Sequence, residues 1–395
     1  TKWAGLSQRV CALATARSAF WGDYVWVVEH VEWTIYSWED SDVKVNSCDQ
    51  GIASLTYLSA VLTVFLGILP VPVVRADTIV VNSCDASDLI AAIDTANSNG
   101  EADTIVLQAG CTYTLGSVHT ADPDGYGPVG LPPITSTIVI QGNGTTITRG
   151  GSDAFRFFYV SDAGDLTLEN MTLSNGLAEG GRGGNARYDG GGGGAGLGGA
   201  IFNRGALTLN DATLSNNTTQ GGNGGDDWSG SSAAAGGGGM GGDGQNGPGG
   251  NLGGAGGGVN GGDGGVSGSH DGKPGGIGGG GGGAANRGGY GRGGGGGFGG
   301  GAGGGNSGGD GGFGGGGGGG QSGANAGDGG FGGGDGGRWC GGGGGGMGGA
   351  IFNDRGTVII NNSTLTGNTA QGGDGASGSG SPDGGGGSAY GGAIF

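Results

Sequence analysis

One unit recurs along this chain with its turn residues in place. Residues 198–222 begin Gly-Gly-Ala-Ile-Phe-Asn and continue with two short runs of alternating Leu and Thr or Ser, and residues 348–373 repeat this order. The unit begins a third time at residues 391–395, and a weaker copy covers residues 166–176. Such recurrence is typical of repeats that stack on one another and is unlike a globule with a single compact core.

The strands that the sequence predicts are short and closely spaced. Turns rich in Gly, Asn and Asp separate β-prone runs of three to six residues, at 137–140, 145–148, 155–160, 166–168 and 171–173. A βαβ arrangement needs a connection of about a dozen residues, which these turns do not supply. The pattern instead predicts coils of roughly 20 to 25 residues, each stacked on the next.

Alternation within the repeats predicts which side chains face the core. Successive side chains of a strand point to opposite faces, so the aliphatic residues would point inward and Thr and Ser outward. The inward set is Leu207, Leu209, Leu214, Val358, Ile360 and Leu365. Asparagines at the corners tolerate left-handed turns and would form ladders when stacked; these are Asn210, Asn216, Asn361 and Asn368. If the two repeats are neighbouring coils, Leu209 lies next to Ile360.

The glycine content divides the chain into two parts of different composition. Of the 118 glycines, 16 precede residue 180 and the other 102 fall within residues 180–395. The part between the two repeats, about residues 221–346, has two interpretations. It is either a flexible linker or a set of packed polyproline II-like strands, because glycine lets threefold strands approach closely.

A weak period of three runs through this glycine-rich part. Val259, Ile277, Phe298, Phe313 and Phe331 follow one another at spacings of 18, 21, 15 and 18 residues. Because a polyproline II strand has three residues per turn, these spacings would place the five side chains on one edge of a threefold strand.

The charge balance restricts the partners of the chain. The net charge is −18 and the pI is about 4.2. A strongly acidic surface disfavours nucleic acid and anionic membranes as partners. It is compatible with cations as weak ligands.

The N-terminal part predicts export. We expect residues 1–50 to be an upstream extension outside the mature protein, or else a small extra domain. Residues 51–76 contain an apolar core, two helix-breaking prolines and a final Val-Arg-Ala, which are features of a cleaved signal peptide. The alternative for residues 51–76 is a retained membrane anchor. Cleavage would leave a mature protein that begins near Asp77.

Export bears on the five cysteines. Cys84 and Cys111 lie 27 residues apart, on either side of one predicted helix and strand. In an oxidising compartment the two are expected to form a disulfide. Cys340 would then remain a single thiol.

Residues 88–115 carry a family resemblance. Asp88-Leu-Ile-Ala-Ala-Ile-Asp-Thr-Ala-Asn97, followed by Ala102-Asp-Thr-Ile-Val-Leu107 and Gly110-Cys-Thr-Tyr-Thr-Leu115, resembles the cap and first coil of secreted bacterial right-handed parallel β-helix proteins of the pectin-lyase-like superfold. The Gly-Gly-Ala-Ile-Phe-Asn units resemble repeats of that group and of polymorphic outer-membrane proteins. The resemblance covers roughly residues 77–222 and 347–395.

The resemblance implies an all-β fold, a right-handed parallel β-helix (a solenoid) with a short N-terminal capping helix and a long glycine-rich insertion. The expected parts are the cap and first coils at 77–220, the insertion at 221–346, and further coils at 347–395, truncated at the C-terminus.

Candidate metal ligands are few. Residues 221–229 match a calcium-binding nonapeptide, which makes Asp226 and Asp227 weak Ca²⁺ candidates, and Asp243 follows half of the same motif. Calcium takes six to eight oxygen ligands, and the other aspartates lack the nine-residue spacing. We therefore expect no cofactor, and Asp side chains that serve mainly to solvate the surface.

Catalysis is not expected. Enzymes of this superfold use clustered acidic residues together with a basic residue or a carboxylate pair. The candidates would be Asp153, Arg156, Asp162, Asp165 and Glu169. We expect a non-enzymatic secreted or cell-surface protein, adhesin-like or structural, that binds an unidentified surface ligand such as a glycan or another cell. The alternative is a polysaccharide lyase or hydrolase.

Overall fold

The computed structural model describes residues 11–16, 31–36, 76–226, 233–248, 252–266, 270–285, 291–379 and 382–395. The chain divides into two units, Thr1–Val73 and Val74–Phe395. In the first unit, β1 (Cys11–Ala16) and β2 (Val31–Tyr36) pair antiparallel. The expected signal peptide lies outside the described residues, apart from Ala76.

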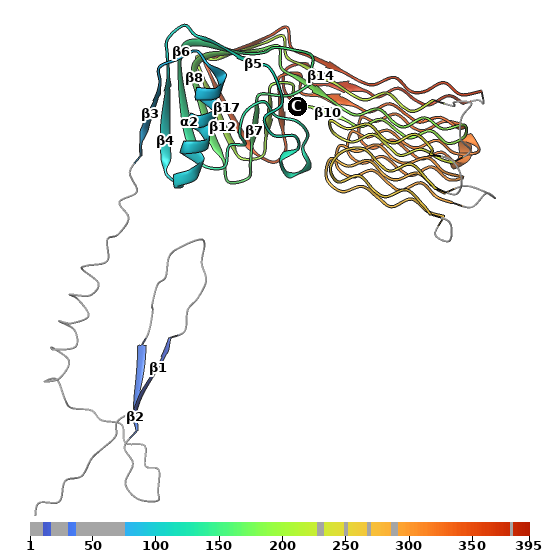
Figure 1. Ribbon diagram of the computed structural model, residues 1–395, viewed down its shortest axis with the longest axis horizontal. Helices are drawn as coiled ribbons and strands as arrows, with labels where there is room; N and C mark the ends of the chain where they lie inside the picture. The colour runs from blue at the N-terminus through green and yellow to red at the C-terminus, as the bar shows by residue number, and fades with distance from the viewer. Residues whose placement is uncertain are drawn as a thin grey trace, which may run out of the picture. The chain divides into compact units, whose positions relative to one another are not determined.

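The second unit begins with a strand and the helix that the sequence predicts. β3 (Thr78–Val81) leads into α2 (Ala86–Asn99), which ends at Gly100 in the left-handed conformation. The apolar face of α2 is buried, and its members are Leu89, Ala92, Ile93 and Ala96. β4 (Ala102–Leu107) and β5 (Thr112–Leu115) follow, and β3 pairs with β4 in parallel. Figure 1 shows α2 beside these first strands.

Successive circuits of the chain then contribute equivalent strands to shared parallel sheets, which we call the strand stack. The first strands are β6 (Thr137–Arg149), β7 (Phe158–Val160), β8 (Asp165–Ser174) and β9 (Leu177–Glu179). The next circuit supplies β11 (Ile201–Asn203), β12 (Ala206–Asn210), β13 (Thr213–Ser215) and β14 (Thr218–Gln220). The third supplies β16 (Ile351–Asn353), β17 (Thr357–Asn361), β18 (Thr364–Thr366) and β19 (Thr369–Gln371).

The pairing order of these strands follows the circuits. The sheets run β16-β11-β7, β17-β12-β8-β6-β4-β3 and β19-β14-β9, and β13 lies between β8 and β18. Leu209 lies opposite Ile360 in parallel register, as expected. The expectation of an all-β class with parallel sheets is confirmed.

Half of the predicted inward set is buried in the core of the strand stack. Leu207, Leu209 and Leu214 are at most 1% exposed, and they pack with the buried aromatic residues Phe155 and Phe157. Of the others, Val358 and Leu365 are partly buried against it, and Ile360 is 37% exposed, so the prediction is wrong for Ile360. Burying a leucine fully stabilises a fold by about 1.5–3 kcal/mol, so each circuit adds several such contributions.

Asparagine ladders run along the stack. The side chain of Asn361 donates to Asn210 (2.9 Å), and that of Asn203 donates to Asn353 (2.7 Å). Of the four predicted corner asparagines only Asn216 has a positive φ, of 56°. At the other corners the left-handed residue is a neighbour of the predicted asparagine, such as Asp211 (φ 52°).

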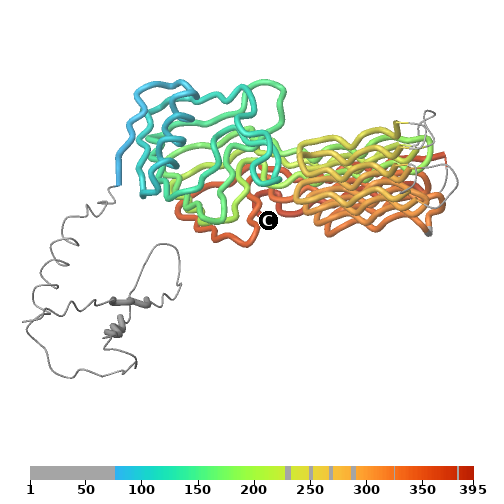
Figure 2. The backbone as a smooth tube through the Cα atoms, turned by 60° about the horizontal axis from the view of Figure 1, so that its bottom comes forward, coloured from blue at the N-terminus to red at the C-terminus, as the bar shows by residue number. Residues whose placement is uncertain are grey.

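The glycine-rich residues are ordered extended segments, which we call the glycine bundle (Figure 2). Their backbone hydrogen bonds repeat every three residues. Gly190, Gly193 and Gly196 donate to the carbonyls of Trp339, Gly342 and Gly345. Gly191 and Gly194 donate to a second segment at Gly184 and Gly181, and Gly192 and Ala195 to a third at Ala302 and Gly299. A repeat of three matches the polyproline II helix, so the packed-strand interpretation is confirmed for the described residues of 221–346.

The bundle extends beyond the expected insertion. Segments near residues 180–195 and 372–388 also belong to it, because their N–H groups bond to glycines of the central part. Three two-residue strands connect it to the strand stack: β10 (Gly196–Leu197), β15 (Gly346–Met347) and β20 (Ala389–Tyr390). The described residues also form two 3-10 turns, η1 (Pro123–Gly125) and η2 (Gly323–Asn325).

The period-three residues do not share one strand edge, so that prediction is wrong. Each of them lies in a separate turn between two extended segments. In the turn Gly297–Gly300, for example, the N–H of Gly300 bonds to the carbonyl of Gly297, and Gly299 has a φ of 75°. A positive φ at the third residue of a turn requires glycine or a similarly permissive residue. The turns nevertheless align, because Phe313 stacks on Phe298 (centroids 5.1 Å apart) and on Phe331 (5.5 Å).

Candidate functional site

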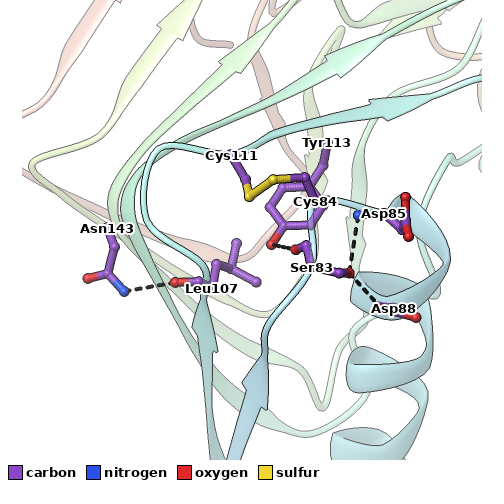
Figure 3. Close-up of a disulfide and its surroundings, with 8 residues drawn as sticks. All are labelled: Ser83, Cys84, Asp85, Asp88, Leu107, Cys111, Tyr113 and Asn143. Carbon is purple, nitrogen blue, oxygen red and sulfur yellow. Dashed lines mark hydrogen bonds between the residues drawn. A yellow bond between two sulfur atoms is a disulfide. The ribbon is translucent and has the colours of Figure 1, made fainter.

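The expected disulfide is present. Cys84, just before α2, is bonded to Cys111, just before β5, with their Cα atoms 5.2 Å apart (Figure 3). Close by, the Tyr113 hydroxyl donates to the carbonyl of Ser83 (2.8 Å). The hydroxyl of Ser83 donates in turn to Asp88 (2.6 Å) at the start of the helix. The bond therefore ties α2 to the first strands. Cys340 is not in a disulfide and is buried.

The five residues considered for catalysis have separate surroundings. Asp153 is exposed, and its backbone carbonyl accepts from Arg149. Asp165 begins β8, where its N–H donates to the carbonyl of Ser136. Glu169 accepts from the side chain of Asn210 at 3.4 Å.

Arg156 is a buried structural cation. Its guanidinium donates to the backbone carbonyls of Tyr126, Gly127, Leu197 and Gly198. Burial lowers the pKa of Arg156 from 12.5 to about 10. Because these carbonyls belong to the loop after η1 and to the end of β10 with the residue that follows it, Arg156 fixes the point where the strand stack and the glycine bundle meet.

Asp162 belongs to an ion-pair network beside that junction. Arg204 pairs with Asp162 (3.1 Å) and with Asp354 (3.2 Å), and its guanidinium lies 5.0 Å from the ring centroid of Tyr126. The neighbouring Tyr159 donates to Asp124, and burial raises the pKa of its hydroxyl. Asp162, Arg204 and Asp354 follow within two residues of the ends of β7, β11 and β16, which are neighbours in one sheet, so Arg204 connects three successive circuits of the chain.

The calcium candidates are on the glycine bundle. Asp243 accepts the backbone N–H of Arg182 (2.8 Å) through its carboxylate. Asp226 is exposed, its backbone N–H donates to Asn185 (2.9 Å), and Asp227 lies outside the described residues. Within the described part of the chain, no three His, Cys, Asp or Glu side chains gather closely enough to hold a metal ion.

The hydrogen bond that Asp243 accepts from a backbone N–H belongs to a general pattern. Several backbone N–H groups at the exposed surface of the bundle donate to Asp or Asn side chains instead of to backbone carbonyls. Other pairs of this kind are Arg292 with Asp271, Asp328 with Asp310, and Gly329 with Asp335. Unpaired backbone donors destabilise a fold, so these aspartates have a structural role that their sequence spacing did not indicate.

A polar pocket of about 270 Å³ lies where the strand stack meets the bundle. Its lining carries two carboxylates, one guanidinium and two amides, from Glu179, Asp243, Arg182, Gln220 and Asn223. Glu179 and Gln220 are partners in neighbouring strands. Three glycines complete the wall. No sequence motif marked this pocket, because only stacking brings its segments together.

The opposite end of the bundle carries Arg187, Tyr188, Arg338 and Trp339, which we call the Arg–aromatic cluster. Arg187 lies 5.2 Å from the ring centroid of Tyr188, and Arg338 lies 4.3 Å from that of Trp339. The two rings meet edge to face, with centroids 5.5 Å apart. Arg338 bridges to Gly320, close to η2, which Figure 1 shows at the far end of the bundle. A sequence signal existed: in both repeats Arg and an aromatic residue stand one residue before the glycine run that leads to Gly-Gly-Ala-Ile-Phe-Asn.

No helix among the described residues is both long and apolar enough to cross a membrane. No family model matches the chain, and neither a curated protein nor a solved structure shows significant similarity to it.

Proposed function

We propose that the chain is an exported, non-enzymatic right-handed parallel β-helix that acts as an adhesin-like or structural protein at the cell surface or in the medium. In this proposal α2 caps the first coil, and the glycine bundle projects from one side of the solenoid. Parallel pairing of equivalent strands from successive circuits supports the β-helix assignment.

The observation that carries the proposal is the distribution of side chains along the bundle. Its turns next to the strand stack carry apolar residues, of which Phe298 and Phe313 pack on the core aromatics; Phe298 lies 5.9 Å from Tyr126. The far end carries arginines and aromatic residues instead. The extended segments between these two ends consist mainly of glycine. The bundle therefore resembles a rigid support, with one end attached to the strand stack and the other end available to a ligand.

Export is supported by the disulfide Cys84–Cys111 together with the expected signal peptide. The test is to fuse residues 51–76 to a reporter enzyme that is active only outside the bacterial cytoplasm. Reporter activity, lost when an arginine replaces Leu66, is the expected result. An inactive reporter would contradict export through this segment.

Adhesin-like binding has a direct test. The full chain is immobilised and offered to a glycan array and to bacterial and host cells. Retention of a defined glycan or cell type supports the proposal. Retention of none, with export intact, leaves only the structural form of the proposed function.

The alternative is a polysaccharide lyase or hydrolase, which the polar pocket favours because Glu179, Asp243 and Arg182 line it together. Incubation with polygalacturonate and calcium distinguishes the two. Release of unsaturated products or reducing ends, lost on replacing Asp162 or Asp165, or Glu179 in the pocket, would establish the enzyme. An intact polymer supports the non-enzymatic protein.

A further inference from the structure

We propose that the Arg–aromatic cluster at the far end of the bundle binds an acidic polysaccharide, through the carboxylates of its uronic acid units. This inference rests on the proposed binding function and names its partner class.

The chemistry of the four side chains leads to this ligand. Each guanidinium lies over a neighbouring ring, at 5.2 Å for Arg187 and 4.3 Å for Arg338. A stacked guanidinium keeps its N–H donors in its own plane, where they can bind the two oxygens of a carboxylate. The aromatic rings of Tyr188 and Trp339 supply apolar surface for the C–H faces of sugar rings.

The positive charge of the cluster is not neutralised within the described part of the chain. The ion pairs found there involve Arg204, Lys273 and Arg355 but neither Arg187 nor Arg338. In a protein of net charge −18, Arg187 and Arg338 place two cations close together, and neither forms an ion pair with a described residue. Charge complementarity therefore favours an anionic ligand at this end.

The backbone holds the cluster in place. The N–H of Arg338 donates to the carbonyl of Pro382 (2.8 Å), and that of Trp339 to Gly320 (2.9 Å). The carbonyl of Trp339 accepts from Gly190 (3.0 Å). Neighbouring segments thus fix both halves before any ligand arrives, which lowers the entropy lost on binding.

Trp339 has an unusual backbone conformation, which allows its ring to be removed without straining the backbone. Its φ is 70°, in the left-handed region that bulky residues rarely occupy. Such residues cost stability and persist most often at functional sites. Glycine adopts this conformation without strain, so Trp339→Gly removes the ring without imposing a new backbone cost.

The experiment measures binding of the full chain to polygalacturonate by biolayer interferometry, with dextran as the neutral polymer. We expect polygalacturonate to bind and dextran to bind at least tenfold more weakly. The double variant Arg187→Gln/Arg338→Gln should lose at least tenfold in affinity. Arg292→Gln removes an exposed arginine that belongs to neither the cluster nor the polar pocket, and it should leave the affinity unchanged. Trp339→Gly should lose at least tenfold while unfolding at the same or a higher urea concentration.

Other outcomes overturn the inference. Equal binding of dextran would exclude recognition of the carboxylate. Equal binding of double-stranded DNA or of phosphatidylglycerol vesicles would indicate a general polyanion surface. Full affinity in the double variant would place the polymer elsewhere, for example in the polar pocket. In that case only the assignment to the cluster fails, and the proposed non-enzymatic binding function still stands if the chain is exported and binds the polymer. Cleavage of the polymer would instead contradict the proposed function itself.

Discussion

The N–H of Gly193 donates to the carbonyl of Gly342 at 2.9 Å, although 149 residues separate the two glycines. The same two circuits bring Leu209 opposite Ile360 in the strand stack. One stacking register therefore runs through both the sheets and the glycine bundle. A disturbance of the bundle should consequently weaken the alignment of the strands.

Replacing Gly193 with alanine tests this connection. An added Cβ would overlap the carbonyl oxygen of Gly222, which belongs to the backbone and cannot rotate away. We expect Gly193→Ala to lower the free energy of unfolding by about 1–3 kcal/mol, as overpacking does. Urea denaturation followed by circular dichroism provides the measurement.

Gly386→Ala is the matched control in the same bundle. Gly386 is exposed, and the nearest atom to its added Cβ is 3.7 Å away. Alanine here should change stability by less than about 0.5 kcal/mol. If both variants lose stability equally, close packing of glycine is not the cause.

Loss of the disulfide should destabilise the start of the strand stack. The bond closes a loop between positions 27 residues apart. For such a loop the double variant Cys84→Ser/Cys111→Ser should lose roughly 3 kcal/mol, measured by urea denaturation without reductant. The same variant should not respond to dithiothreitol, whereas the wild type should. A wild type that is equally stable with and without reductant would contradict the prediction.

Asp122 should make stability depend on pH. One of its oxygens accepts the N–H of Gly127, and the other is buried. Burial raises the pKa of this carboxyl above its ordinary value of 3.8. Because the folded state binds the proton more tightly, the contribution of Asp122 is fully present below the unfolded pKa. It is lost as pH rises through the folded pKa.

Asp122→Asn cannot titrate, so its stability relative to the wild type should increase between about pH 4 and pH 7. Urea unfolding of both proteins at these two pH values measures the difference. A difference that is constant or that decreases with pH would show that Asp122 has no raised pKa.

Asp243 should stabilise the bundle as a hydrogen-bond acceptor rather than as a charge. Its carboxylate accepts the N–H of Arg182 at 2.8 Å. Asp243→Ala should therefore lose about 1 kcal/mol of unfolding free energy, whereas Asp243→Asn keeps an acceptor oxygen and should lose less. Thermal unfolding with and without calcium separates this role from metal binding. Calcium-dependent stabilisation of the wild type alone would favour a metal site instead.

The strand stack could be predicted because its side chains alternate. Leu207 and Leu209 recur as Val358 and Ile360, and a repeated inward pattern fixes the register. The disulfide followed from the positions of Cys84 and Cys111 around one helix. Both predictions rest on side chains whose residue type alone, aliphatic or cysteine, indicates their place in the fold.

The glycine bundle could be predicted only as one of two alternatives. Its order resides in backbone hydrogen bonds that repeat every three residues, and glycine has no side chain to display that period. The spacing of Phe298, Phe313 and Phe331 did reflect it, but the sequence could not tell a turn from a strand edge. The Arg–aromatic cluster and the polar pocket depend on which segments become neighbours, and that follows from the packing of the whole bundle.

The turns of the bundle restrict how this part of the chain can change in length. Successive turns at Val259, Ile277, Phe298, Phe313 and Phe331 are 18, 21, 15 and 18 residues apart. Each residue of an extended segment faces one of three neighbours in rotation, so a single deletion would rotate every later residue by a third of a turn. An outward aspartate would then face a neighbouring backbone. Insertions and deletions in related chains should therefore come in whole triplets, much as they do in a reading frame.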